Sequence, residues 1–80
     1  MPRFNIGQAY LVMAYRNGPD RDPNVFAVEY LGDGIFRYYS NVKNSSAHQL
    51  ATYSDFGPFR LEFIKMDLPI EMVQQITWNL

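Results

Sequence analysis

Four stretches of the chain combine apolar, β-branched and aromatic residues in patterns typical of β-strands: residues 8–16, 25–31, 34–40 and 59–66. The first is apolar at both odd and even positions, which is typical of a central strand covered on both faces. In the last stretch the apolar residues Phe59, Leu61 and Phe63 alternate with the charged residues Arg60 and Glu62. This alternation predicts a strand with one face toward solvent.

The second and third stretches are separated by Gly32-Asp33-Gly34, which predicts a β-hairpin because glycine and aspartate accept the positive φ of a tight turn. Side chains alternate between the two faces of a sheet, so the length of this loop decides which residues lie together. With an even-length loop one face carries Phe26, Val28, Tyr30, Ile35, Arg37 and Tyr39, and we expect this face to form the main core. The opposite face then carries Val25, Ala27, Glu29, Leu31, Phe36, Tyr38 and Ser40.

Between the strands, the sequence predicts a loop and a short helix. Residues 17–24 hold two prolines, a glycine and several Asx residues, which favour a surface loop. Ser46 and Gln49 fit a capping box, in which two side chains satisfy backbone amides at a helix start. We therefore expect a helix over residues 47–53.

The C-terminal segment also predicts a helix. Asp67-Leu68-Pro69 suits a helix start, because proline is tolerated in the first turn and an acidic group favours the positive end of the helix dipole. The apolar side of this helix would carry Ile70, Val73, Ile76 and Thr77. A strand over residues 75–80 is the alternative, since its apolar side chains alternate.

Together these elements predict a single α+β domain over residues 1–80. Its core would be a small antiparallel sheet of about four strands, in the order β-β-β-α-β-α, with one or two short helices. The alternative is an SH3-like small β-barrel, in which the sheet curls on itself and covers both faces of the central hairpin.

The composition is that of a folded domain, with 48% hydrophobic and 16% aromatic residues in a chain of 80. The net charge is −1 and the basic residues are scattered, which disfavours capture of duplex nucleic acid or of anionic membranes. No apolar run approaches the roughly 18 residues of a membrane span, and the N-terminal residues lack the features of a secretory signal. We therefore expect a soluble, cytoplasmic protein.

Few residues carry the chemistry of a catalytic or metal site. The chain has no cysteine, and His48 is its only histidine. Ser45 and Ser46 precede this histidine, but adjacency in sequence supplies neither the geometry of a triad nor an oxyanion hole. Residues 20–24 begin like an EF-hand calcium loop but lack the glycine and glutamate that must follow, and no glycine-rich phosphate loop occurs. We predict no cofactor and no metal, and an enzyme using His48 is the least favoured function.

The aromatic residues favour a protein partner. Interface cores are enriched in Tyr, Trp, Phe, Met and Arg, as this chain is, so we expect a non-enzymatic protein-binding module that docks an aromatic sheet face onto a larger protein. It would act as an adaptor or an inhibitor. Its size and its lack of catalytic groups are shared by phage-type inhibitors of host defence complexes, such as anti-CRISPR proteins. A homo-oligomer is a further option.

The alternative partner is single-stranded nucleic acid, because Phe36-Arg37-Tyr38-Tyr39 with Lys43 offers rings for base stacking beside basic groups. For either partner, the predicted binding residues are Leu31, Phe36, Arg37, Tyr38, Lys43, His48 and Tyr53. Among the aromatic residues we assign Phe36 and Tyr38 to the partner surface. Those assigned to the core are Tyr10, Tyr30, Phe59 and Phe63.

Overall fold

The computed structural model describes residues 3–15, 22–40, 42–56 and 60–80. These form one antiparallel sheet of five strands in the order β4-β3-β2-β1-β5. The strands are β1 (Ala9–Tyr15), β2 (Asn24–Gly32), β3 (Ile35–Tyr39), β4 (His48–Thr52) and β5 (Arg60–Met66). A 3-10 turn, η1 (Tyr53–Phe56), follows β4, and the helix α1 (Ile70–Trp78) follows β5. The predicted α+β class is confirmed, with five strands instead of four.

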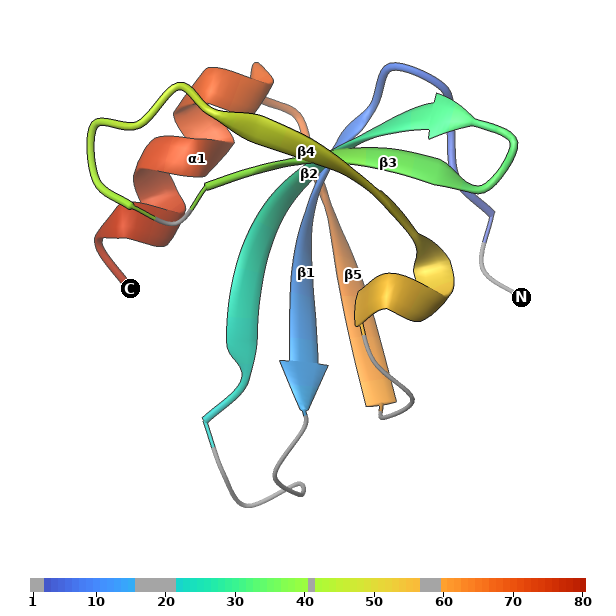
Figure 1. The fold of residues 1–80 in the computed structure, drawn as a ribbon, viewed down its shortest axis with the longest axis horizontal. Coiled ribbons are helices and arrows are strands. Elements are labelled where there is room, and N and C mark those ends of the chain that lie inside the picture. Colours follow the sequence, from blue (N-terminus) through green and yellow to red (C-terminus); the bar gives the residue numbers. More distant parts are fainter. Residues whose placement is uncertain (1–2, 16–21, 41, 57–59) are drawn as a thin grey trace.

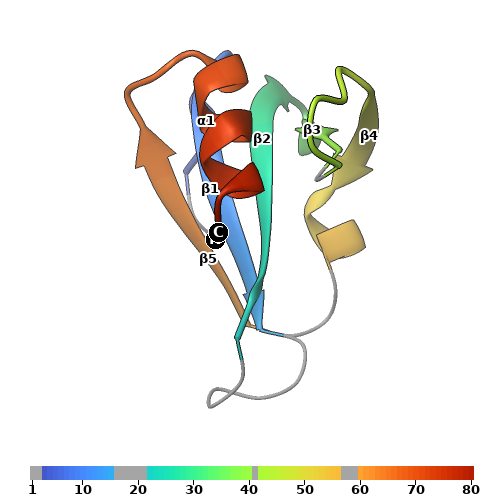
Figure 2. The same ribbon diagram turned by 90° about the vertical axis from the view of Figure 1, so that its left-hand side faces the viewer.

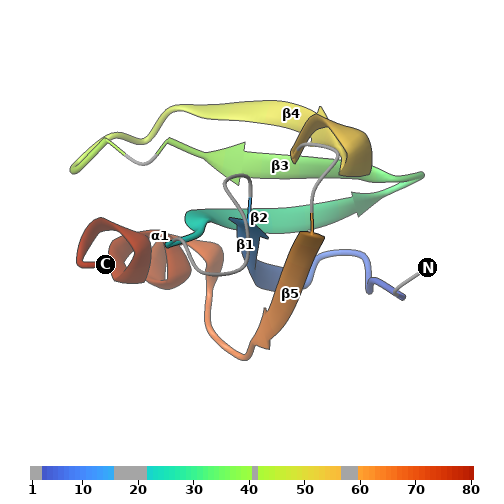
Figure 3. The ribbon, with the colours of Figure 1, turned by 90° about the horizontal axis from the view of Figure 1, so that it is seen from below.

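The sheet is strongly twisted because its longest strand belongs to two parts of it. Through residues 24–29, β2 pairs with β1, and through residues 28–32 it pairs with β3. As a result β3 and β4 cross above β1 and β5 (Figure 1), and the view from below shows the same crossing (Figure 3). The edge strands β4 and β5 do not pair in the described residues, so the sheet curls without closing into the alternative barrel.

The concave side of the sheet, which we call the inner face, holds the main core. Val12, Val28 and Phe36 are fully buried there, and Phe56 of η1 and Phe4 of the N-terminal segment pack against them. The rings of Phe36 on β3 and Phe63 on β5 have centroids only 5.7 Å apart, although β2 and β1 separate their strands. This short distance reflects how far the sheet curls around its aromatic core.

The opposite side, the helix face, is covered by α1 over β1 and β2 (Figure 2). Ile70 and Val73 of the helix pack against Ala9 and Ala27, whose small side chains let the helix approach closely. The predicted helix is confirmed; it starts directly after Pro69, and the alternative strand over residues 75–80 does not form. No helix in the described residues is both long and apolar enough to cross a membrane.

The predicted hairpin is confirmed, but the predicted pairing of its two arms is wrong. Asp33 and Gly34 form the turn with φ of 55° and 76°. A β-bulge between Tyr30 and Gly32 leaves Leu31 as an extra residue, so Tyr30 lies opposite Phe36. One extra residue exchanges the two faces of β3, which moves Phe36 and Tyr38 to the inner face with Val28.

The predicted helix over residues 47–53 is also wrong, because this segment forms β4 and enters η1. All five residues of β4 pair with β3 in the sheet. The predicted capping residue Ser46 precedes a strand, and it is the neighbouring Ser45 whose Oγ accepts a hydrogen bond from the Ala47 backbone N–H, at 3.2 Å, within a turn. A helix of two turns has a costly nucleus and little to offset it, whereas the strand completes a sheet.

The aromatic residues predicted to lie in the core do so where the structure describes them. Tyr10 is buried in the main core, and Tyr30 and Phe63 are half-buried against it, as predicted. Residues 17–21 of the predicted loop, and the predicted core residue Phe59, lie outside the described residues.

We expect Phe36→Ala to lower the free energy of unfolding by about 3–5 kcal/mol, because it empties the centre of the aromatic core. Phe36→Leu should cost about 1 kcal/mol and covers the case in which the alanine variant does not fold. Ile35→Ala, on the same strand with its side chain on the other face, is the matched control and should change the free energy by less than about 1 kcal/mol. Urea unfolding followed by circular dichroism measures all three free energies. Equal decreases for Ile35→Ala and Phe36→Ala would contradict the placement of Phe36 at the centre of the core.

Candidate protein-binding groove

Three hollows in the surface meet at one side chain, Phe26, and we call them together the Phe26 groove. The first, of about 790 Å³, lies between the start of β2 and the end of α1. It is lined by Met13, Asp22, Pro23, Asn24, Val25, Phe26, Thr77, Trp78 and Leu80. The second and third, of about 280 and 190 Å³, lie along β4 and share both Phe26 and Tyr38.

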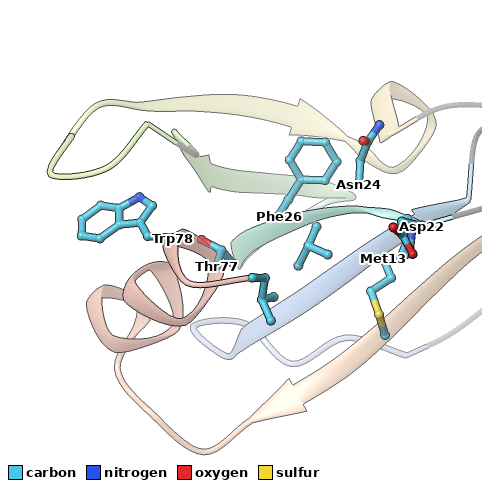
Figure 4. A pocket seen from close by; sticks show the side chains of 9 residues that line it. Met13, Asp22, Asn24, Phe26, Thr77 and Trp78 are labelled. Carbon is cyan, nitrogen blue, oxygen red and sulfur yellow. The ribbon is translucent and has the colours of Figure 1, made fainter.

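The groove exists because β3 is shorter than β2. The described pairing of β2 with β3 begins at Val28, so the first residues of β2 have no strand beside them on that side. Phe26 is therefore half-buried, and its side chain points from β2 toward the β3–β4 hairpin (Figure 4). Its ring contacts those of Tyr38 and Phe56, with centroid distances of 6.1 and 5.7 Å.

Polar groups are placed around these rings. The Tyr38 hydroxyl donates a hydrogen bond to the Gln49 side-chain oxygen, which fixes the tyrosine ring at the wall of the second hollow. At the other end, Trp78 and Thr77 lie at the end of α1, opposite Asn24 at the start of β2 (Figure 4). The buried Trp78 Nε1 has no hydrogen-bond partner among the described residues.

The helix α1 also holds the second hollow in place. Gln74 is buried, and its side-chain amide donates hydrogen bonds to the carbonyl oxygens of Ser45 at 2.7 Å and Ser40 at 3.4 Å. Both carbonyls belong to the connection between β3 and β4. Because Ser40 and Ala47 line the second hollow, these bonds set its shape.

The structure brings together only two of the seven predicted binding residues, Tyr38 and His48, which both line the second hollow. The prediction that Phe36 lies on the partner surface is wrong. Its side chain is 0% exposed and cannot contact a partner in this fold, because the bulge turns it into the core. Tyr53 is half-buried against the same core and stacks on Phe63 with ring centroids 5.6 Å apart.

The other three predicted residues lie away from the groove. Arg37 is on the helix-face side of β3, where its guanidinium pairs with Glu29 at 3.6 Å. Leu31 is the extra residue of the bulge and is half-buried, and Lys43 is exposed in the turn after β3. The predicted set therefore does not form one surface.

Sequence reasoning missed Phe26 and Trp78 as groove residues. Phe26 has the alternation of a core residue, and only the early end of β3 leaves it half-buried in a gap. The sequence signal that could have found this gap is the polar segment after Ser40, which stops the strand before it can cover the start of β2.

The described residues contain no group of three or more His, Cys, Asp or Glu side chains placed to hold a metal ion. Comparison of the chain with protein-family models, with curated proteins and with solved structures finds no match in any of the three.

One acidic residue borders the groove at the end of β4. Asp55 lines the third hollow, and its carboxylate accepts hydrogen bonds from the Thr52 backbone N–H at 2.7 Å and the Thr52 hydroxyl at 3.0 Å. First the backbone donor and then the hydroxyl lower the pKa of this carboxyl below its ordinary value of 3.8. The third hollow therefore has a carboxylate at its rim at neutral pH.

This lowered pKa predicts a pH-dependent contribution of Asp55 to stability. A carboxyl whose pKa is lower in the folded state stabilises the fold fully above its unfolded pKa of 3.8, and the contribution is lost as the pH falls through the folded pKa. We expect the melting temperature of Asp55→Asn to lie below that of the wild type at pH 7, and the difference to shrink below pH 3.8. Thermal melts between pH 7 and about pH 2 measure it.

Thr52→Val is the companion variant, because it removes the hydroxyl donor and keeps the backbone donor. When Thr52→Val is present in both proteins, the difference in melting temperature that Asp55→Asn causes at pH 7 should be smaller, but it should still shrink as the pH falls. A difference between wild type and Asp55→Asn that stays constant across this pH range would contradict the assignment.

Proposed function

We propose that this protein is a non-enzymatic binding module that docks the Phe26 groove onto a larger protein, as an adaptor or an inhibitor. The observation that carries the proposal is the pair of half-buried rings, Phe26 and Tyr38, standing side by side in a hollowed surface. Side chains that bind partners most strongly are large and aromatic, and they cluster in pockets from which water is excluded on binding.

The lining of the groove supports a protein partner. Phe26, Tyr38 and Trp78 supply aromatic surface, and Met13 adds an adaptable apolar side chain. Among the lining residues that the structure describes, the acidic and basic side chains other than His48 are Asp22 and Asp55, which lie at opposite ends of the groove. An aromatic centre with charges only at its margins is the arrangement of a protein interface.

A nucleic-acid partner gains no comparable support. Stacked bases need basic groups beside the rings to hold the phosphates. Arg37, the basic residue of the predicted stacking segment, points to the other face and pairs with Glu29. Among the described residues that line the groove there is no lysine or arginine.

The proposal predicts that a photo-reactive amino acid in place of Gln49, at the second hollow, crosslinks the protein to one partner in its native cells. The same group in place of Glu71, exposed on α1, is the matched control and should capture no protein reproducibly. Mass spectrometry of the crosslinked product identifies the partner and the contact residues. Equal capture from both positions, or none from Gln49, would overturn the proposal.

With that partner purified, we expect Tyr38→Ala to weaken binding roughly thirty-fold, or about 2 kcal/mol, because it removes a central aromatic contact. Met72→Ala also removes an exposed apolar side chain, but outside the groove, and should leave the dissociation constant unchanged. Isothermal titration calorimetry measures both, and a melt of each variant separates lost binding from lost folding.

A further inference from the structure

The strand beside the groove, β4, has one edge that no described strand pairs with. It is the last strand of the sheet, and among the described strands its partner is β3. An edge strand presents a row of backbone N–H and C=O groups to solvent, which is a template for another strand. The structure shows which residues present them.

The phase of the hydrogen bonds follows from the residues next to β4. The Ser40 N–H bonds the Ala47 carbonyl at 3.0 Å, so this pair is of the bonded type. Backbone groups alternate in direction along an antiparallel strand, so Gln49 and Ala51 also bond to β3. The backbone groups of His48, Leu50 and Thr52 therefore point outward.

The Thr52 backbone confirms this phase independently, because its N–H reaches Asp55 Oδ2, outside the sheet. Asp55 and η1 thus close one end of the edge. In the described residues, no hydrogen bond occupies the outward groups of His48 and Leu50. The open part of the edge is the stretch of residues 48–50.

The edge also lacks the residues with which proteins block strand addition. The other edge strand, β5, carries Arg60, Glu62 and Lys65. None of the five residues of β4 is Lys, Arg, Asp, Glu or Pro, and the central Leu50 is 65% exposed. An uncharged edge with an exposed apolar residue at its middle is open to pairing.

The hollows beside β4 match the side chains of an added strand. The second hollow is lined by Gln49 and the third by Ala51, which are two residues apart on the same face. Alternate residues of an extended chain lie about 7 Å apart and point to the same face. The side chains at positions i and i+2 of an added strand would therefore reach one hollow each.

We infer that β4 binds an extended segment of a partner protein as a sixth strand of the sheet, with large apolar side chains of that segment in the second and third hollows. This inference rests on the proposed function and specifies how the groove is used. Backbone bonds to His48 and Leu50 align the segment and add some affinity, and the side chains in the hollows provide most of the affinity and the sequence preference. The Asp55 carboxylate favours a basic residue and disfavours an acidic one at the end of the segment beside it.

A second copy of this chain is a poorer occupant than a partner segment. Pairing of two β4 strands about Leu50 would bring Gln49 and Ala51 of the second copy to the hollows. These side chains are polar or small and would leave hollows of about 280 and 190 Å³ largely unfilled. Self-pairing through β4 would therefore bury less side-chain surface than a partner segment with large apolar residues.

The test selects nine-residue peptides from a random displayed library on the immobilised full-length protein. We expect the selected peptides to share large apolar residues at i and i+2, and to prefer lysine over glutamate at one end unless Asp55 is replaced by asparagine. N-methylation of the peptide backbone at alternate residues should weaken binding about ten-fold for each hydrogen bond lost. Methylation at the intervening residues should have little effect.

The matched protein variants are Leu50→Pro and Leu50→Ala. Proline is tolerated on an edge strand where its nitrogen faces solvent, so Leu50→Pro should fold while losing one outward donor. It should weaken the peptides about ten-fold more than Leu50→Ala, which keeps that donor. The methylation series tests the same bond without changing the protein.

The results that would contradict strand addition can be told apart from those that would contradict groove binding. Peptides that need Tyr38 but tolerate methylation at every position would overturn strand addition and leave groove binding intact. A partner crosslinked at Gln49 while no peptide is selected would do the same. Self-association in sedimentation that Leu50→Pro abolishes would assign the edge to a second copy. Failure of both the crosslinking and the selection would overturn the proposed function as well.

Discussion

The fold depends on the burial of one ring, that of Phe36. Its centroid lies 5.0 Å from those of Phe4 and Tyr30, 5.7 Å from that of Phe63 and 5.8 Å from that of Phe56. These four rings come from the N-terminal segment, β2, β5 and η1, so the sheet can bring them together only by curling. A chain of 80 residues has few other ways to bury enough apolar surface, because small domains bury a smaller share of their surface than large ones.

The same curl produces the surface proposed to bind a partner. To wrap the core, β2 divides its length between β1 and β3, and this leaves Phe26 in the gap between the two parts of the sheet. The curl stops before the edges meet, so β4 and β5 each have one side that is unpaired among the described residues. The groove and the open edge are thus consequences of the way a small sheet encloses its aromatic residues.

The parts of the fold that depend on local sequence could be predicted, and the parts that depend on distant contacts could not. The turn at Asp33 and Gly34 and the helix after Pro69 have local signals, and both form as predicted. The bulge at Leu31 was missed although Gly32 beside it has a φ of 99°, because a glycine in this loop fits a simple turn as well as a turn with a bulge. For the site, Tyr38 was identified by its aromatic character, whereas Phe26 was missed because its exposure depends on where β3 ends.

An open edge must also be kept from pairing indiscriminately, and the structure limits how much of β4 is available. One end is closed by the Asp55 bonds to Thr52, and the other is bounded by the connection that Gln74 holds against α1. A stretch this short gives too few backbone hydrogen bonds for tight binding by any strand, since each contributes about 1 kcal/mol net. Binding must therefore draw most of its free energy from side chains that fit the hollows beside Phe26 and Tyr38, and this makes the edge selective for sequence.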